Sequence, residues 1–324
     1  LIDASNWLQI ALRNTGQMHS SLEILKEIAE RDPLYRPAFS NAMQLFHAFG
    51  MKDEAEQLIK RIEAFNPDNP DLNLARATSY LYAGEMGKGL QQIEEAAKKA
   101  PLSGVGQLFL SIGLMSTGQF ERALNEGFIY WRPDALYFSG RKDEAIALAR
   151  EHADGGSPDA LFYMLVLENR EKELVDYLEE RWPSLAAFAV ENPGGDNGYD
   201  LMMNIAMAYR RTGNVARADE ALELFEKRIT QLETEGVNNY RLDTSKASYL
   251  AMQGDIDGAL VLLKSAVDEG LSASVDPLRI YPEFEILEGD PRFDEIKAGM
   301  LDNLNYNRRI LELPPFTENY QVAR

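Results

Sequence analysis

The chain contains no cysteine among its 324 residues, which excludes disulfide bonds and thiolate chemistry. Histidine is also scarce. His19, His47 and His152 are the three histidines, and none pairs with another at the spacing that holds a metal ion on a helix. No apolar run approaches the ~18 residues that a membrane span needs. We therefore expect no metal, no cofactor and no membrane-spanning helix.

Positive charge is in short supply. Lys and Arg number 33 against 52 Asp and Glu, which gives a formal net charge of −19. Because nucleic-acid affinity comes largely from Lys and Arg, we expect no nucleic-acid partner. The acidic balance is typical of a soluble surface that resists self-association, and it leaves open an acidic groove for a basic partner.

The motifs of common catalytic sites are missing as well. The sequence has no phosphate loop, dinucleotide-binding glycine motif, zinc-peptidase helix or nucleophile elbow. Asp196, Asn197 and Asp200 do not have the spacing of an EF-hand loop. Adjacent carboxylates such as Glu94 and Glu95 point about 100° apart on a helix, so they do not converge as an acid–base pair. The sequence predicts a chain that is not an enzyme.

What the sequence does contain is a repeated glycine. Gly16, Gly50, Gly84 and Gly118 follow one another at a spacing of 34 residues, and Pro33, Pro67 and Pro101 keep the same step. Each of these glycines is followed five residues later by a small residue, as in the pair Gly50 and Ala55. A fixed period of this length indicates stacked helix–turn–helix units.

Apolar residues recur at helical spacing on both sides of each glycine. In the first unit, Trp7, Leu8, Ala11 and Leu12 precede Gly16 and predict one apolar helix face. A single helix pair cannot bury such a face, so the units must stack. The fold class that we predict is all-α: an α-solenoid, a superhelix of antiparallel helix pairs that ends in a capping helix.

The period breaks after Gly118, since Gly140 follows it by 22 residues. The spacing predicts three regions: four regular units over residues 1–137, irregular or degenerate helix pairs over 138–198, and two further units with a C-terminal cap over 199–324. The loop-rich stretch 191–198 is a candidate hinge. At the C-terminal end we expect polar residues to form the outer face that a terminal repeat requires. These residues are Asn303, Asn305, Asn307, Arg308 and Arg309.

Two sets of residues resemble the tetratricopeptide repeat (TPR) family. The first is Ala77, Tyr80, Gly84, Ala96 and Pro101, and the second is Ala206, Tyr209, Gly213 and Ala218. The segment from Phe284 through Asp290-Pro291-Arg292-Phe293 is similar to the end of TPR arrays in bacterial winged-helix and cyclase-type regulators. The resemblance implies a peptide- or protein-binding module. Because the sequence starts at Leu1 inside an amphipathic pattern, we expect a piece of a larger bacterial signalling or regulatory protein.

In the TPR family the first helix of each pair lines the concave side, which predicts where a peptide or protein partner binds. The candidate groove residues are Asn6, Ile10, Arg13, Asn41, Gln44, His47, Thr78, Tyr82, Met203, Asn204, Arg210 and Arg211. Asparagine can bond a peptide backbone, and methionine adapts to varied partners. Asp71 would repel a terminal carboxylate, so a clamp for chaperone C-termini is not expected.

Two alternatives stay open at this point. One is a scaffold or self-association module, in which the chain forms a homodimer. The other is a small-ligand sensor that uses the aromatic residues of the irregular middle, within 130–138 and at Phe162 and Tyr163. The sequence is compatible with either the cytoplasm or the periplasm.

Overall fold

A computed structural model describes residues 2–32, 35–67, 69–102, 104–192, 200–271 and 282–316 of the chain. All regular secondary structure in these ranges is helical, and most of the helices form consecutive antiparallel pairs. The predicted all-α solenoid is therefore confirmed. No helix in the described part of the chain combines the length and the hydropathy needed to cross a membrane.

The first four helix pairs follow the 34-residue period. They are α1 (Ile2–Asn14) with α2 (Met18–Arg31), α3 (Arg36–Ala48) with α4 (Lys52–Phe65), α5 (Pro70–Tyr82) with α6 (Met86–Lys99), and α7 (Gly104–Ser116) with α8 (Phe120–Glu126). The residue after each turn glycine donates its backbone N–H to the carbonyl five residues earlier, at 2.7–2.9 Å. The glycines have φ between 68° and 81°, the left-handed conformation that this helix end requires.

The middle of the chain is built from shorter helices. The 3₁₀ turn η1 (Ile129–Trp131) leads into α9 (Arg132–Phe138), which is followed by α10 (Lys142–Asp154), α11 (Asp159–Leu167), α12 (Glu171–Arg181) and α13 (Leu185–Glu191). Pro133 lies in the first turn of α9, where its missing N–H costs nothing, and Gly140 ends the turn that follows. The seven-residue α9 is the short helix that the 22-residue spacing predicts.

The C-terminal half returns to longer helices. It contains α14 (Asp200–Arg211), α15 (Val215–Thr234), α16 (Tyr240–Gln253), α17 (Ile256–Asp268), the 3₁₀ helix η2 (Pro282–Leu287) and α19 (Pro291–Ile310). The longest helix of its pairs is α15, whose 20 residues carry Ala218, Ala221 and Phe225 on the buried side. The candidate hinge at 191–198 lies outside the described residues from 193 onward, as does Pro33.

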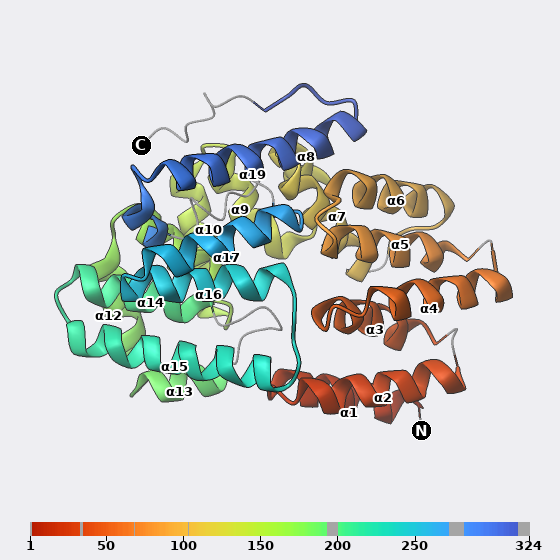
Figure 1. The fold of residues 1–324 in the computed structure, drawn as a ribbon, viewed down its shortest axis with the longest axis horizontal. Helices are drawn as coiled ribbons and strands as arrows, with labels where there is room; N and C mark the ends of the chain where they lie inside the picture. Colours follow the sequence, from red (N-terminus) through yellow and green to blue (C-terminus); the bar gives the residue numbers. More distant parts are fainter. Residues whose placement is uncertain are drawn as a thin grey trace.

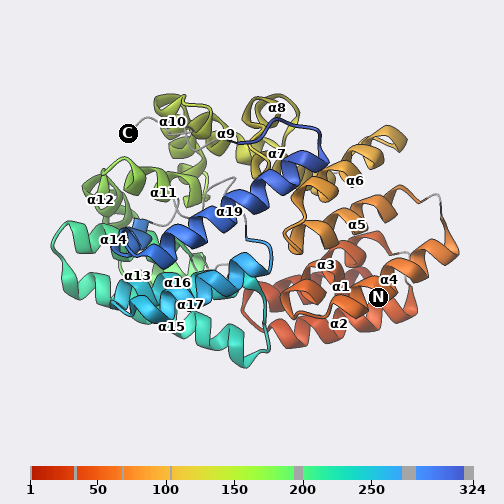
Figure 2. The same cartoon turned by 45° about the horizontal axis from the view of Figure 1, so that its top comes forward.

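The array curves back on itself, so that its two halves meet (Figures 1 and 2). The C-terminal end of α15 lies beside the turn between α1 and α2, and α19 runs across the molecule to α6 and α7. Gln231 of α15 donates to the carbonyl of Gly16 at 3.3 Å, and Asn238 donates its backbone N–H to the carbonyl of Ala48 at 2.8 Å. Asn307 of α19 donates to the carbonyl of Gly84 at 3.0 Å. The turns of the first three units are therefore held by the C-terminal half.

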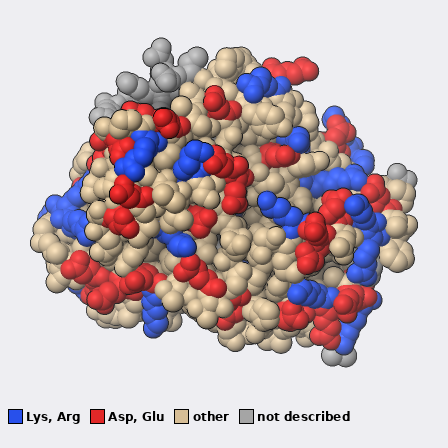
Figure 3. Space-filling view, in the orientation of Figure 1, with Lys and Arg blue, Asp and Glu red and all other residues tan. Residues whose placement is uncertain are grey.

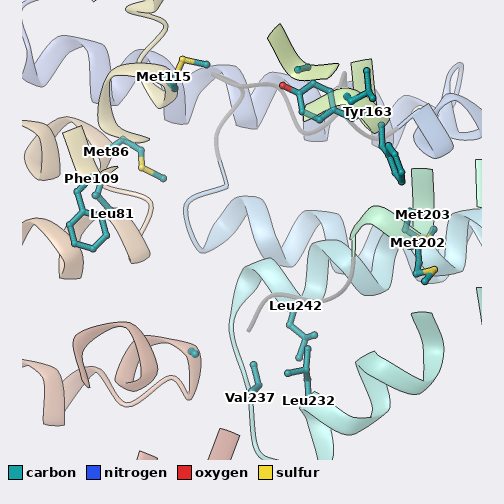
Figure 4. Packing of buried hydrophobic residues seen from close by; sticks show 14 of the residues in the cluster. Leu81, Met86, Phe109, Met115, Tyr163, Met202, Met203, Leu232, Val237 and Leu242 are labelled. Atoms are coloured by element: carbon teal, nitrogen blue, oxygen red, sulfur yellow. The ribbon is translucent and has the colours of Figure 1, made fainter. Parts of the chain in front are cut away.

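The buried core follows this closed path. One hydrophobic cluster extends from Met18 in α2 to Met252 in α16, and a second one joins α16 and α17 to η2 and α19. Figure 4 shows Leu232, Val237 and Leu242 gathered where α15 passes into α16. Small residues on the first helices, such as Ala77 and Ala206, are fully buried and allow close approach of neighbouring helices.

Two expectations about side chains are wrong. Trp7 and Leu8, expected on the apolar contact face of the first helix, are 70% and 53% exposed. Asn307, expected on the polar outer face of the cap, is 1% exposed and points at the turn of the third unit. Asn303 likewise donates to the carbonyls of Val267 and Leu271. The helical period alone does not say on which side an additional helix will lie, and here α19 packs on the array through its polar side as well as its apolar one.

Candidate functional site: the inner face of the first helices

The twelve predicted groove residues fall into three groups on the first helices of the pairs. The first group lies on α1 and α3, the second on α3 and α5, and the third on α14. Thr78 belongs with the second group, and its hydroxyl donates to the carbonyl of Leu74 in its own helix at 2.9 Å. The three groups differ in how far their polar atoms are already used within the chain.

The first group is a row of amide side chains between α1 and α3. Asn6 is buried, and its Oδ1 accepts from Gln9 Nε2 at 3.1 Å and from Asn41 Nδ2 at 3.3 Å. Arg13 Nη1 donates to Gln44 Oε1 at 3.1 Å. Asn41, Gln44 and Arg13 are partly exposed, and so is Ile10. This row therefore offers amide and guanidinium groups to the surface in a fixed arrangement.

The second group is centred on His47. Its imidazole stacks on Tyr82 at 5.6 Å between ring centroids, and its Nε2 shares a hydrogen bond with Ser79 Oγ at 2.7 Å. Burial, together with the positive charges of Lys52 and Arg241, lowers the pKa of His47 to about 4. The imidazole is consequently neutral at pH 7 and serves as a packing and hydrogen-bonding group.

Arg241 completes this group and comes from the opposite half of the chain. It lies in the first turn of α16, and its guanidinium sits over the ring of Tyr82 at 4.5 Å from the centroid. The sequence contained no signal for this contact, because Arg241 has no counterpart in the 34-residue pattern. We call Arg13, Asn41, Gln44, Tyr82 and Arg241 the inner strip.

The third group, on α14, is occupied by contacts within the chain. Met203 and Asn204 are buried. Arg210 donates to the carbonyl of Met252 at 2.7 Å, and Arg211 pairs with Glu171 at 2.6 Å and with Glu285 at 3.0 Å. The structure thus brings the α1, α3 and α5 residues together with α16, while the α14 residues link α12, α16 and η2.

The aromatic residues of the irregular middle pack against each other. Phe162 stacks on Phe188 at 5.8 Å, and the rings of Tyr137 and Tyr163 meet edge to face at 6.5 Å. Asp134 lies buried among them and accepts a hydrogen bond from Tyr163. Burial raises the pKa of Asp134 to about 7. These side chains fill the space between α9, α11 and α13, and the small-ligand alternative remains a prediction.

Two shallow pockets lie away from the inner strip. One of about 220 Å³ between α10 and α12 is lined by Arg150, Asp154, Glu173, Asp176, Tyr177, Glu180 and Arg181. The other, of about 380 Å³, lies beside the turn at Gly118. The first is crossed by ion pairs such as Arg181 with Asp154 at 2.8 Å, so both of its arginines already have carboxylate partners. Among the residues that the structure describes, no cluster of three or more His, Asp or Glu side chains could hold a metal ion.

Acidic and basic side chains are interspersed on one face of the protein. In Figure 3, acidic and basic side chains alternate over the visible face, with several of them in contact. Many ion pairs join neighbouring turns of one helix, as between Lys172 and Asp176 at 2.7 Å. Exposed pairs of this kind contribute little to stability. The visible face offers no extended basic patch of the sort that binds phosphate groups.

Comparison with known proteins finds similarity to helical-repeat proteins. No protein-family model matches the chain. A stretch of 132 residues, 41% of this chain, is 26% identical to cellulose synthase operon protein C of Escherichia coli (strain K12) and corresponds to 11% of that protein's length. The chain thus matches only a small part of this relative.

Similar solved structures include three chains, none of which is more than 18% identical to this one. The Cut9 component of an APC/C hetero-tetramer with Hcn1 gives a TM-score of 0.49 at 15% identity, covering 88% of this chain and 52% of that one. A tetratricopeptide repeat protein from Parabacteroides merdae ATCC 43184 gives 0.32 at 16% identity, covering 88% and 98%. Human IFIT1, in a dimer with m7Gppp-AAAA, gives 0.37 at 18% identity, covering 98% and 74%.

Proposed function

We propose that this chain is a non-catalytic TPR-type module that binds an extended segment of a protein partner along the inner strip. The observation that carries the proposal is that Asn41 and Gln44 lie one turn apart on the same, partly exposed side of α3. Asn41 uses its amide nitrogen towards Asn6, and Gln44 uses its amide oxygen towards Arg13. The remaining halves of the two amides are an acceptor and a donor.

An acceptor and a donor one helical turn apart match the N–H and C=O groups of an extended peptide. Tyr82 and Arg241 continue the strip with an aromatic ring and a planar cation, two groups that are enriched at protein interfaces. The hydrogen bonds to Asn6 and Arg13 hold the two amides in place before any peptide arrives. Such preorganisation lowers the entropic cost of binding.

Peptides selected from a random library against the whole chain test this proposal. We expect the selected peptides to lose about tenfold in affinity to an Asn41→Ala/Gln44→Ala variant, the equivalent of about 1.4 kcal/mol, measured by isothermal titration calorimetry. The control is Gln57→Ala, which removes an exposed amide from α4 and should leave affinity unchanged. Equal affinity for the double variant and wild type, with both proteins folded, would contradict the proposal.

We further propose that the module belongs to a larger bacterial signalling or regulatory protein. The support is the similarity of the segment from Phe284 to Phe293 to the closing segment of arrays in such proteins, together with a relative that is itself bacterial and much longer than this chain. In the structure this segment forms η2 and the start of α19, capped by Asp290, whose side chain accepts from the N–H of Arg292 at 2.9 Å. The complete open reading frame decides the matter: an encoded DNA-binding or cyclase domain supports the proposal, and its absence would remove it.

A further inference from the structure

The outer side of α1 presents an apolar stripe to solvent. Trp7 is 70% exposed and Leu8 is 53% exposed, and Ala4 and Ala11 on the same side are exposed too. Residues at positions i, i+3, i+4 and i+7 form one face of a helix, the pattern of a helix–helix contact. An apolar helix face of this kind is normally covered by another helix, and the described residues leave it open.

The internal repeat shows what happens to this face in the later units. A shift by 34 residues places Ala4, Leu8 and Ala11 on Ala38, Ala42 and Leu45 of α3, which are all buried. Three such shifts, to α7, place Trp7 and Leu8 on Phe109 and Leu110, which are buried as well. One shift places Trp7 on Asn41 of α3, which is partly exposed. The face is therefore mostly covered in the later units, with Asn41, Arg76 and Ser79 partly exposed, and it is exposed in the first.

What differs between these helices is the preceding unit. Like α3, α1 packs against the second helix of its own pair, so that contact cannot explain the difference. However, α3 also contacts α2, and α7 contacts α6, whereas the described residues place no helix in the corresponding position before α1.

One ion pair identifies the direction of this face directly. The counterpart of Leu8 in the third unit is Arg76 of α5, and its Nη2 lies 2.7 Å from Glu63 Oε1 on α4, the second helix of the preceding pair. The position occupied by Leu8 thus faces a preceding second helix. Because α1 has the apolar Leu8 where α5 has Arg76, we expect the neighbour of Leu8 to be apolar where the neighbour of Arg76 is Glu63.

We propose that the outer face of α1, formed by Ala4, Trp7, Leu8 and Ala11, is a docking surface for the second helix of a further helix pair. The occupant is an amphipathic helix that carries an aliphatic stripe like those of α2 and α4, with no acidic residue opposite Leu8. It continues, by one step, the series of interfaces between α2 and α3, α4 and α5, and α6 and α7. The inner strip shares one register position with this face, because Asn41 is the counterpart of Trp7, whereas the positions of Ala4, Leu8 and Ala11 have no counterpart in the strip.

The test places a copy of residues 36–69 directly before residue 2, which keeps the 34-residue register, and carries Glu63→Leu in that copy. Trp131→Phe and Trp182→Phe leave Trp7 as the sole tryptophan. We expect acrylamide quenching of Trp7 to fall several-fold in the extended chain. We also expect the melting temperature to rise by several degrees with the native tryptophans in place. Leu8→Asp in the extended chain should abolish both effects.

A charge exchange provides the matched control. We also extend the chain with the unmodified copy, which retains its Glu63. This addition should raise the melting temperature more in a Leu8→Arg chain than in a Leu8→Asp chain, since the arginine restores the pair seen between Arg76 and Glu63. Without the added unit, Leu8→Asp should leave the melting temperature unchanged, because the side chain is exposed.

Three results would overturn the proposal. One is unchanged quenching of Trp7 in the extended chain. Another is a marked loss of stability from Leu8→Asp alone, which would mean that the face packs within this chain. The third is a dimer in sedimentation analysis that Trp7→Ser disrupts, which would make a second copy of the chain the occupant.

Discussion

The first four helix pairs and the C-terminal half are made of similar helices, yet they are held together in different ways. In the first half each turn repeats the same backbone hydrogen bond around a left-handed glycine. In the C-terminal half the decisive contacts each occur once: Asn307 on the turn at Gly84, Asn238 on Ala48, and Arg241 on Tyr82. The helix pairs are thus formed by a repeated turn, whereas the array is closed by contacts that each occur once.

The turn glycines show the difference most clearly. Gly84 and Gly213 have φ of 74° and 84°, so both occupy the left-handed region for the same local reason. A Cβ added to Gly84 would lie 2.4 Å from the carbonyl oxygen of Gly270, whereas one added to Gly213 would meet nothing within 4 Å. The turn at Gly213 is thus open to the surface, whereas the turn at Gly84 contacts Gly270 in the C-terminal half.

The largest effect that we predict separates these two glycines. Gly213→Ala should cost about 1–2 kcal/mol, the penalty for a left-handed alanine. Gly84→Ala should cost this amount and about 1–3 kcal/mol more, since backbone atoms of Gly270 must move aside. Urea denaturation of the two variants measures the difference. Equal denaturation midpoints would contradict the prediction, because they would mean that the backbone at Gly270 moves away from the added Cβ at no measurable cost.

A pH-dependent prediction concerns the contact between α3, α5 and α16. His47 has a folded pKa of about 4, below its ordinary value of 6.5. Its stabilising contribution is therefore complete above pH 6.5 and is lost as the pH falls towards 4, by up to about 3 kcal/mol. His47→Gln keeps a partner for Ser79 and cannot become charged, so we expect its melting temperature to fall less than that of wild type between pH 6.5 and 4.

Asp134 in the irregular middle provides the contrasting control. Its pKa is raised to about 7, so protonation below pH 7 relieves a buried charge and opposes the effect of His47. Asp134→Asn should therefore steepen the loss of stability on acidification, while His47→Gln should make it shallower. The same slope in both variants would contradict the opposite signs assigned to His47 and Asp134.

The smallest of the three effects comes from the asparagine that joins α19 to the third unit. Asn307 accepts from the N–H of Gly87 at 2.9 Å and donates to the carbonyl of Gly84 at 3.0 Å. Asn307→Ala leaves buried backbone groups unsatisfied and should cost about 1–3 kcal/mol in the free energy of unfolding. Asn305→Ala, on the same helix but bonded to Phe316 within the C-terminal half, should cost less. A larger loss from Asn305→Ala would overturn this ranking.

The helices and turns could be predicted because their causes are local. The 34-residue glycine step predicts the first four pairs, and the 22-residue step from Gly118 to Gly140 predicts the short α9. The sides on which helices are covered could not be predicted in the same way. Trp7 belongs to an apolar stripe that the described chain leaves open, and Asn307 belongs to a polar one that it buries. The periodicity of apolar residues predicts that a helix has an apolar face, but which element covers that face depends on residues far away in the sequence.

The candidate site divides along the same line. The first helices follow from the repeat, and the resemblance to the TPR family implies Asn41, Gln44, His47 and Tyr82 as groove residues. Their partners do not follow from it. Arg241 reaches Tyr82 from 159 positions later in the chain, a separation given by 241 minus 82. The occupation of Arg210 and Arg211 by Met252, Glu171 and Glu285 also depends on how α12, α16 and η2 converge.

By itself, the sequence determined an all-helical array of paired helices, the positions of its turns and the place where its regularity ends. These features depend on helix periodicity, on left-handed glycines and on proline, which act over a few residues. The closure of the array, the burial of His47 and the exposure of Trp7 were decided by the tertiary structure alone. The closure depends on small rotations added over many helix pairs, and it brings Arg241 next to the stacked rings of His47 and Tyr82. The exposure of Trp7 has another cause, since no described helix lies on the outer side of α1.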